Sequence, residues 1–137
     1  PIGVSNKVRD GGDCTLVSYS KSLHLCIKTA DYLSKELGIE CDIIDLRTLR
    51  PLDLNPVYES ISKTNRVVIV QEGWPICGSA SEIAFQITRD IFDELDAPPA
   101  RVTSEDVPMP YAANLEKAVL PSQEKIVNAV KEVCYLI

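Results

Sequence analysis

The sequence predicts one α/β domain in which a mainly parallel β-sheet lies between layers of helices. Short apolar runs, typical of buried strands, alternate with segments of helical periodicity along the chain. The 137 residues, 45% of them hydrophobic, are enough for one buried core. No internal repeat or low-complexity linker divides the chain. Strands that alternate with helices favour parallel pairing, because each helix carries the chain back across the sheet.

The first strands and the first helix follow from local pattern. We expect a short extended piece at Lys7–Arg9, and residues 14–19 are β-rich and apolar enough for a buried strand. A helix then begins with Ser20 or Ser22 as its cap. Apolar residues three or four apart give this helix one apolar face, and Gly38 ends it.

The same alternation continues through the middle of the chain. Residues 41–46 read as a strand, and the continuous apolar run Val67–Val70 is typical of a strand buried on both faces. Between them, Asn55 as N-cap and Pro56 as first helical residue predict a helix that reaches about Thr64.

Two further helices and one strand complete the predicted fold. Helical periodicity indicates helices over about residues 79–94 and 123–134. A short strand is expected at residues 100–103. The segment 106–111 contains two X-Pro bonds, which favour an extended or turning backbone.

The charge balance disfavours a nucleic-acid partner. Lys and Arg total 14 against 20 Asp and Glu, which gives a net charge of −6. Such a surface repels phosphate backbones and attracts a basic protein or peptide. No apolar stretch approaches the roughly 20 residues that a membrane span needs.

The cysteines are predicted to be reduced thiols, mostly small core residues. Their number is odd, their spacing is wide, and the sequence has no CxxC pair and only one histidine. This pattern disfavours a zinc site. The five are Cys14, Cys26, Cys41, Cys77 and Cys134.

The beginning of the sequence predicts a piece of a longer protein. The chain starts Pro1-Ile2-Gly3-Val4 without Met, and its first residues are not those of a signal peptide.

The loop Gly73–Gly78 lies between a predicted strand and a predicted helix, where α/β sheets often bind ligands. The following helix N-terminus could hold an anion. The loop matches neither the GxGxxG fingerprint nor a Walker A motif, and it lacks the Walker lysine. The simpler interpretation is a connecting loop whose Trp74 packs within the domain or at a subunit interface.

The single histidine, His24, is predicted to face solvent or an interface. A catalytic histidine needs a partner that orients it. Helical spacing places His24 next to Ser20, Ile27 and Lys28, none of which is a carboxylate. Any Cys–His pair would have to use this same histidine.

Charged residues gather around the predicted strand end at residues 45–53. Asp45, Arg47, Arg50 and Asp53 could clamp a carboxylate or phosphate, or pair with each other and with a neighbouring subunit.

An acidic run, Asp90, Asp93, Glu94 and Asp96, ends the predicted helix. Such a run usually forms a solvated face, and acid at a helix C-terminus is mildly unfavourable against the helix dipole. It could therefore be retained for a partner. Taken alone, the residues indicate an acidic α/β domain without an assembled catalytic constellation.

Several segments, in order over nearly the whole chain, resemble the beta subunits of thiamine-diphosphate-dependent 2-oxoacid dehydrogenases. The stretch Asp106-Val107-Pro108-Met109-Pro110-Tyr111-Ala112 is more similar to the pyruvate enzymes than to the branched-chain enzymes. The other segments are residues 15–20, 44–53, 72–75 with Gly78 and Glu82-Ile83, 95–98 and 101–103.

The resemblance implies that residues 1–137 are the second domain of such a subunit, the transketolase C-terminal-like domain. It implies a three-layer α/β/α fold with a five-stranded, mainly parallel sheet whose first strand is antiparallel, and Lys7–Arg9 would be that strand. In the family, thiamine diphosphate and its Mg lie between the alpha subunit and the first domain of the beta subunit. The glutamate that activates the thiamine ring belongs to that first domain. No residue here matches that glutamate, so we expect neither catalysis nor cofactor binding by this chain alone.

The same resemblance implies a role in assembly and docking. The family's domain contributes to an α2β2 heterotetramer of alpha and beta subunits. In the pyruvate enzymes it also binds the small, basic peripheral-subunit-binding domain of dihydrolipoyl acetyltransferase. The residues implicated correspond to Asp96 and the final carboxylate, here Ile137. The implied location is the mitochondrial matrix in a eukaryote, the cytoplasm in a bacterium, or a plastid.

Two alternatives remain at this point. One is the same domain from a branched-chain, acetoin or transketolase-type enzyme, against which Met109-Pro110-Tyr111 argues. The other is a stand-alone flavodoxin-like module that binds a nucleotide at the Gly73–Gly78 loop, although this loop lacks a ligand fingerprint.

Overall fold

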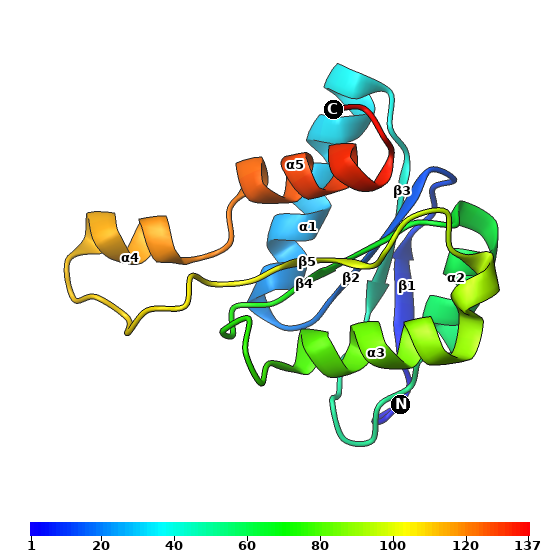
Figure 1. The fold of residues 1–137 in the computed structure, drawn as a ribbon, viewed down its shortest axis with the longest axis horizontal. Helices are drawn as coiled ribbons and strands as arrows, with labels where there is room; N and C mark the ends of the chain where they lie inside the picture. Colours follow the sequence, from blue (N-terminus) through cyan, green and yellow to red (C-terminus); the bar gives the residue numbers. More distant parts are fainter.

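The computed structural model describes residues 1–137 as a sheet with two helices on each face (Figure 1). The five strands lie in the order β1-β3-β2-β4-β5. β1 is antiparallel to β3, and every other neighbouring pair is parallel. The predicted mixed, mainly parallel sheet is therefore confirmed. The strands are β1 (Asn6–Arg9), β2 (Cys14–Ser18), β3 (Cys41–Asp45), β4 (Val67–Val70) and β5 (Ala100–Val102).

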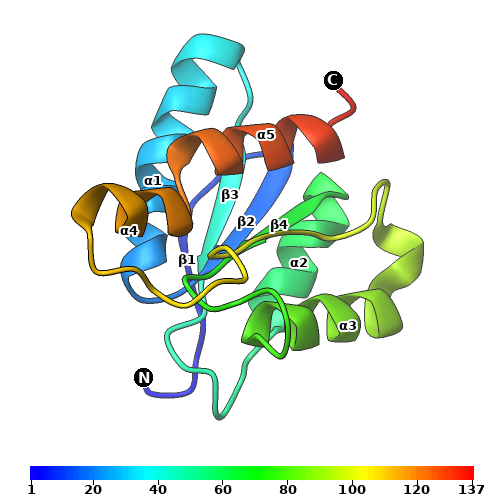
Figure 2. The ribbon, with the colours of Figure 1, turned by 60° about the vertical axis from the view of Figure 1, so that its left-hand side comes forward.

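The helices form the two outer layers. α1 (Lys21–Tyr32) and α5 (Gln123–Val133) pack against one face, and α2 (Asn55–Thr64) and α3 (Ser79–Ile91) against the other (Figure 2). α4 (Ala113–Val119) projects from the body of the domain. No helix of the structure has the length and apolar character needed to cross a membrane.

The apolar runs are explained by a sheet that is covered on both faces. Val68 and Val70 belong to the core beneath α1 and α5, whereas Val67 and Ile69 belong to the core beneath α2 and α3. Successive side chains of a strand point to opposite faces, so a strand between two helical layers has no polar face.

Of the two predicted helix caps, the one at Asn55 is wrong and the one at Ser20 is confirmed in position only. Leu54 occupies the N-cap position of α2, and Asn55 is already the first helical residue. The Asn55 amide donates to the carboxylate of Asp53 at 3.2 Å. Ser20 occupies the N-cap position of α1, but its side chain makes no capping hydrogen bond. Gly38 does end the first helical segment, in a left-handed conformation after a π-helical turn at Leu33–Leu37.

Two elements differ from the periodicity analysis. The helix predicted over residues 79–94 ends at Ile91 and continues as a 3-10 turn, Phe92–Glu94. α4 was not predicted, because seven residues are too few to show an apolar face and the preceding prolines indicated irregular structure.

Candidate docking surface

The loop at residues 95–99 fixes Asp96 at the surface between the 3-10 turn and β5. The Asp96 amide donates to the carbonyl of Asn65 at 2.8 Å. The hydroxyl of Tyr135 donates to the Asp96 carbonyl at 2.7 Å. The backbone is thus held by two other parts of the chain, while the Asp96 side chain stays 56% exposed.

Arg66 joins this loop to the end of α5. Its Nη2 lies 3.6 Å from Oδ2 of Asp96, and its Nε donates to the carbonyl of Val133 at 3.1 Å. The pair with Asp96 is long and solvated, and such pairs contribute little stability. The carboxylate of Asp96 therefore remains able to accept a cation from a partner.

Ile137 lies at the same end of α5. It is 83% exposed and lines a shallow groove together with Arg101, Thr103 and Glu132. We name the surface formed by residues 95–99 and 132–137 the docking edge. Both residues singled out by the resemblance belong to this edge, but they line different pockets, Asp96 beside Phe92 and Ile137 beside Arg101.

Acidic groups prevail at and beside the docking edge. Asp93, Asp96 and Glu132 are exposed. Three cations lie near them. Arg66 is 3.6 Å from Asp96, and Lys125 pairs with Glu105 at 2.6 Å. Arg101 donates to the carbonyl of Pro75 and to the hydroxyl of Ser81, each at 2.6 Å. The surface therefore suits a basic partner.

Asp90 takes a different role from the other acids of the run. Hydrogen bonds from Arg89, and then from Tyr58, lower the pKa of Asp90 to about 2. The Tyr58 hydroxyl donates at 2.7 Å and so ties α2 to α3. This carboxylate is occupied within the domain.

Sequence comparison agrees with the fold. The sequence model of the family "Transketolase, C-terminal domain" matches residues 3–126. The chain belongs to this family. The match rules out the interpretation as a stand-alone flavodoxin-like module.

Among known proteins, the domain is similar to pyruvate dehydrogenase E1 component subunits beta. It is 43% identical to the subunit from Rickettsia bellii (strain RML369-C), over 99% of this chain and 42% of the relative. It is 45% identical to the mitochondrial subunit beta-1 of Arabidopsis thaliana, over 98% of this chain and 37% of the relative. The chain thus spans less than half the length of these relatives.

A solved structure shares the fold. A split-gene transketolase, described as an inactive beta4 tetramer, superposes with a TM-score of 0.83 at 25% sequence identity. The superposition covers 98% of this chain and 42% of that one. The five-stranded arrangement of the transketolase C-terminal domain is therefore retained here.

Within this transketolase C-terminal domain, Gln71 fills the Gly73–Gly78 loop. Its Oε1 accepts from the Ala80 amide at 3.1 Å, and its Nε2 donates to the Trp74 carbonyl at 3.1 Å. A Cβ at Gly78 would lie 2.4 Å from the backbone carbonyl oxygen of Trp74 and 2.2 Å from Nε2 of Gln71, so glycine is required there. The Ala80 amide in the first turn of α3 therefore donates to Gln71 and is not free for an anion, as expected of a connecting loop.

Trp74 is less buried than expected of a tryptophan that packs within the domain. Its indole N–H donates to the carbonyl of Val107 at 3.1 Å, but the residue remains 55% exposed. This bond anchors the base of the segment that leads to α4.

His24 is exposed, as predicted, in an open polar groove. The tertiary structure adds a carboxylate that helical spacing could not show, because Asp45 from β3 lines the same groove. The Asp45 carboxylate accepts from the Arg47 amide at 3.0 Å, and Asp53 accepts from the Ser5 amide at 3.0 Å. These aspartates therefore bind backbone amides and do not pair with the neighbouring arginines.

The cysteines divide into three buried thiols and two accessible ones. Cys14, Cys26 and Cys41 are buried, as predicted, while Cys77 is exposed and Cys134 is half-buried. Burial raises the pKa of Cys26 to about 12. The pKa of Cys134 is lowered to about 7, mainly by the adjacent Cys14 thiol. Burial raises this pKa, and the charge of Arg66 lowers it further.

The acidic, histidine and cysteine side chains of this domain lie apart from one another as possible metal ligands. No three of its His, Cys, Asp and Glu side chains come together as ligands for an ion. Mg²⁺ is held mainly by carboxylates, phosphates and water.

Sequence reasoning missed Arg66 and Tyr135 at the docking edge. Neither belongs to a motif, and each contacts the Asp96 region only through the tertiary fold.

Proposed function

We propose that this domain is the assembly and docking part of a pyruvate dehydrogenase beta subunit. Asp96 and Ile137 would bind the basic peripheral-subunit-binding domain of dihydrolipoyl acetyltransferase. The observation that carries this proposal is the exposed carboxylate of Asp96 on a loop that Asn65 and Tyr135 hold from two sides. A loop whose backbone is already held can present its acidic side chain to a basic partner without first being ordered.

The parent enzyme would oxidatively decarboxylate pyruvate and transfer the acetyl group to lipoamide. The names of the relatives support this assignment. Thiamine diphosphate and its Mg would bind outside residues 1–137, in the parts of the heterotetramer that this chain does not contain. We assign no catalytic residue to this domain, which would be inactive alone.

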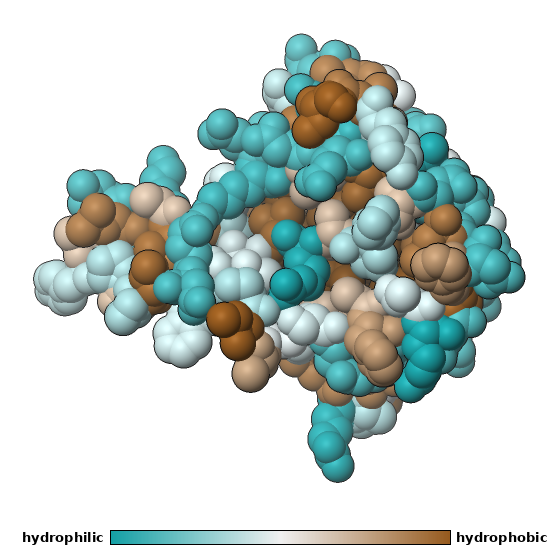
Figure 3. Space-filling view, in the orientation of Figure 1, coloured by the Kyte–Doolittle hydropathy of each residue, from teal (hydrophilic) through white to brown (hydrophobic).

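Exposed apolar side chains support a role in assembly with an alpha subunit and a second beta subunit. The segment at residues 106–118, here named the arm, is almost entirely exposed. It carries Met109, Leu115 and a fully exposed Tyr111. Figure 3 shows the arm extending from the body with apolar residues among its polar ones. Exposed apolar patches of this kind are typical of subunit interfaces.

The location would follow the source of the chain. The Arabidopsis relative is named as mitochondrial, which supports the mitochondrial matrix for a eukaryotic source. A bacterial source would place the enzyme in the cytoplasm, and a plastid is the remaining alternative.

Replacing Asp96 by Ala tests the docking role. We expect Asp96→Ala to weaken binding of the acetyltransferase's peripheral-subunit-binding domain by about 2–5 kcal/mol, the usual cost of truncating one partner of an interfacial charge pair. Isothermal titration at low and at physiological salt measures this cost. Glu124→Ala is the matched control, because it removes an exposed acid at the opposite end of α5 from the docking edge.

Two results would contradict the proposal. Equal losses in the two variants would indicate a general charge effect without a specific site at Asp96. Absence of binding by the folded, unmodified chain would favour the branched-chain, acetoin or transketolase-type alternative.

A further inference from the structure

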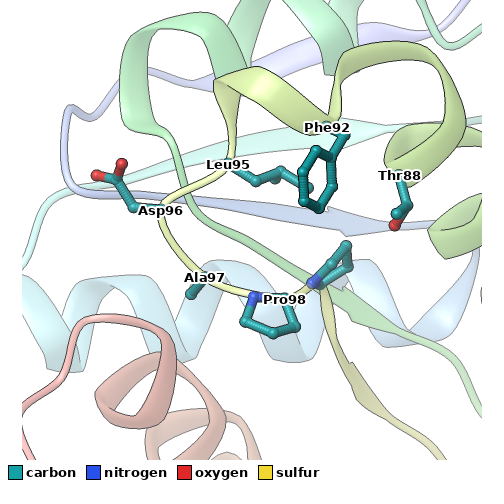
Figure 4. Close-up of a pocket in the computed structure, with 7 residues that line it drawn as sticks. Thr88, Phe92, Leu95, Asp96, Ala97 and Pro98 are labelled. Atoms are coloured by element: carbon teal, nitrogen blue, oxygen red, sulfur yellow. The ribbon is translucent and has the colours of Figure 1, made fainter.

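An apolar pocket of about 330 Å³ lies beside Asp96, and the docking residues already described do not account for it. It is bounded by the end of α3, the 3-10 turn and the loop at residues 95–99 (Figure 4). Phe92 and Thr88 form one side, and Pro98 the other. The side chain of Leu95 extends toward the Phe92 ring, while the carboxylate of Asp96 points away from it.

Phe92 is unusually exposed for an aromatic side chain that lines a pocket. It is 70% exposed, because α3 ends at Ile91 and the following turn directs the ring outward. The pocket floor is supplied by Ala97, which is buried. The ring and the pocket together therefore offer apolar surface to a partner.

The surroundings of the pocket are acidic. Asp93 and Glu94 follow Phe92 directly in the 3-10 turn, and Asp96 lines the pocket. An occupant must therefore combine an apolar group with nearby positive charge. The volume lies at the lower end of small-ligand pockets, roughly 300–1,000 Å³, which suits one protein side chain better than a cofactor.

We propose that the Phe92 pocket receives an apolar side chain of the same basic partner whose cation reaches Asp96. This inference rests on the docking role proposed above and adds a second, uncharged contact to it. The two contacts respond differently to salt. Screening weakens the charge pair at Asp96, whereas burial of an apolar side chain at Phe92 is hardly affected.

Two phenylalanines on one helical segment allow a matched experiment. Phe85 is also exposed, at 59%, but it does not line the pocket, and its ring lies 5.9 Å from the guanidinium carbon of Arg89. We would titrate the peripheral-subunit-binding domain of the acetyltransferase into Phe92→Ala and Phe85→Ala at low and at physiological salt. Phe92→Leu is the conservative variant, because it keeps an apolar side chain at the pocket. Thermal melting of each variant checks that the fold is intact.

We expect Phe92→Ala to lower the affinity about tenfold at both salt concentrations, as truncating an interface anchor does. Phe85→Ala should bind as the unmodified chain does, Phe92→Leu should recover most of the affinity, and Asp96→Ala should reduce the dependence on salt.

Unchanged affinity of Phe92→Ala with a weakened Asp96→Ala would overturn the pocket proposal and leave the docking role in place. Equal losses for the two phenylalanine variants would also overturn it, because the effect would not depend on the pocket. If the unmodified chain does not bind, the docking role fails, and this inference fails with it.

Discussion

Arg66 connects three parts of the docking edge. Its guanidinium contacts Asp96 and the Val133 carbonyl, and its charge favours the thiolate of Cys134. Its carbonyl accepts a hydrogen bond from the Thr15 amide at 2.8 Å, which fixes its position against β2. One residue directly before β4 thus contacts both segments of the docking edge.

The thiol of Cys134 provides a test of this arrangement. Because the pKa of Cys134 is about 7, we expect its alkylation by iodoacetamide to reach half its maximal rate near pH 7. Arg66→Ala removes a charge that favours the thiolate, so the midpoint should move to higher pH. Peptide mass spectrometry separates Cys134 from the exposed Cys77. The same midpoint in both proteins would show that Arg66 does not affect this thiol.

Asp42 joins elements on one side of the sheet. It lies in β3 with its side chain fully buried, accepts from the Ser60 hydroxyl at 2.6 Å, and pairs with Lys63 at 2.8 Å. The Gly11 amide donates to the same carboxylate at 2.6 Å. The network continues from Ser60 to Thr15 of β2 at 2.6 Å. A single carboxylate therefore secures α2 and the β1–β2 turn to the sheet.

The pH dependence of unfolding should report this network. Burial opposes ionisation of Asp42, but bonds from Lys63, Ser60 and Gly11, with the charge of Lys7, outweigh it and lower the pKa of Asp42. A lowered pKa in the folded state stabilises the fold above the unfolded pKa of roughly 3.9, and this contribution is lost as pH falls through the folded value.

We expect Asp42→Asn to lower the free energy of unfolding at pH 7 by about 2 kcal/mol, the scale of hydrogen bonds to a charged group. The difference from the unmodified chain should shrink as pH falls below the ordinary carboxyl pKa. Urea unfolding at neutral and acidic pH measures both quantities. A difference that is constant with pH would indicate lost packing without a contribution from ionisation.

The whole molecule consists of a doubly covered sheet and one projecting arm. Hydrogen bonds hold the arm at its base, where the Trp74 indole donates to Val107 at 3.1 Å and the Glu105 amide donates to Val119 at 2.9 Å. Beyond these bonds, residues 108–118 carry no buried side chain. The arm is therefore the part of the domain that most needs a neighbouring subunit.

Limited proteolysis tests this division of the molecule. We expect chymotrypsin to cut the isolated chain first within the arm, after Tyr111 or Leu115, because exposed segments with few contacts open most easily. Mass spectrometry of the first fragments locates the cut. An earlier cut after Phe85 or Phe92, both exposed on the body, would show that the arm is better protected than its contacts indicate.

The sequence by itself determined the layered sheet. The unbroken run Val67–Val70 required a strand covered on both faces, and apolar spacing identified four helices with boundaries close to the observed ones. These signals are local, because a strand or helix shows its buried faces within its own residues. Asp96 and Ile137 were found through resemblance to a family and not through periodicity.

The tertiary structure alone decided how the candidate site is built. Arg66, Tyr135 and Asp96 are far apart in sequence, and only folding places them in contact. The pocket at Phe92 depends on the residue at which α3 gives way to the 3-10 turn. The seven residues of α4 carry too weak a periodicity to predict a helix. Local patterns report burial along one element, whereas a binding surface arises from contacts between elements, which no single segment of sequence specifies.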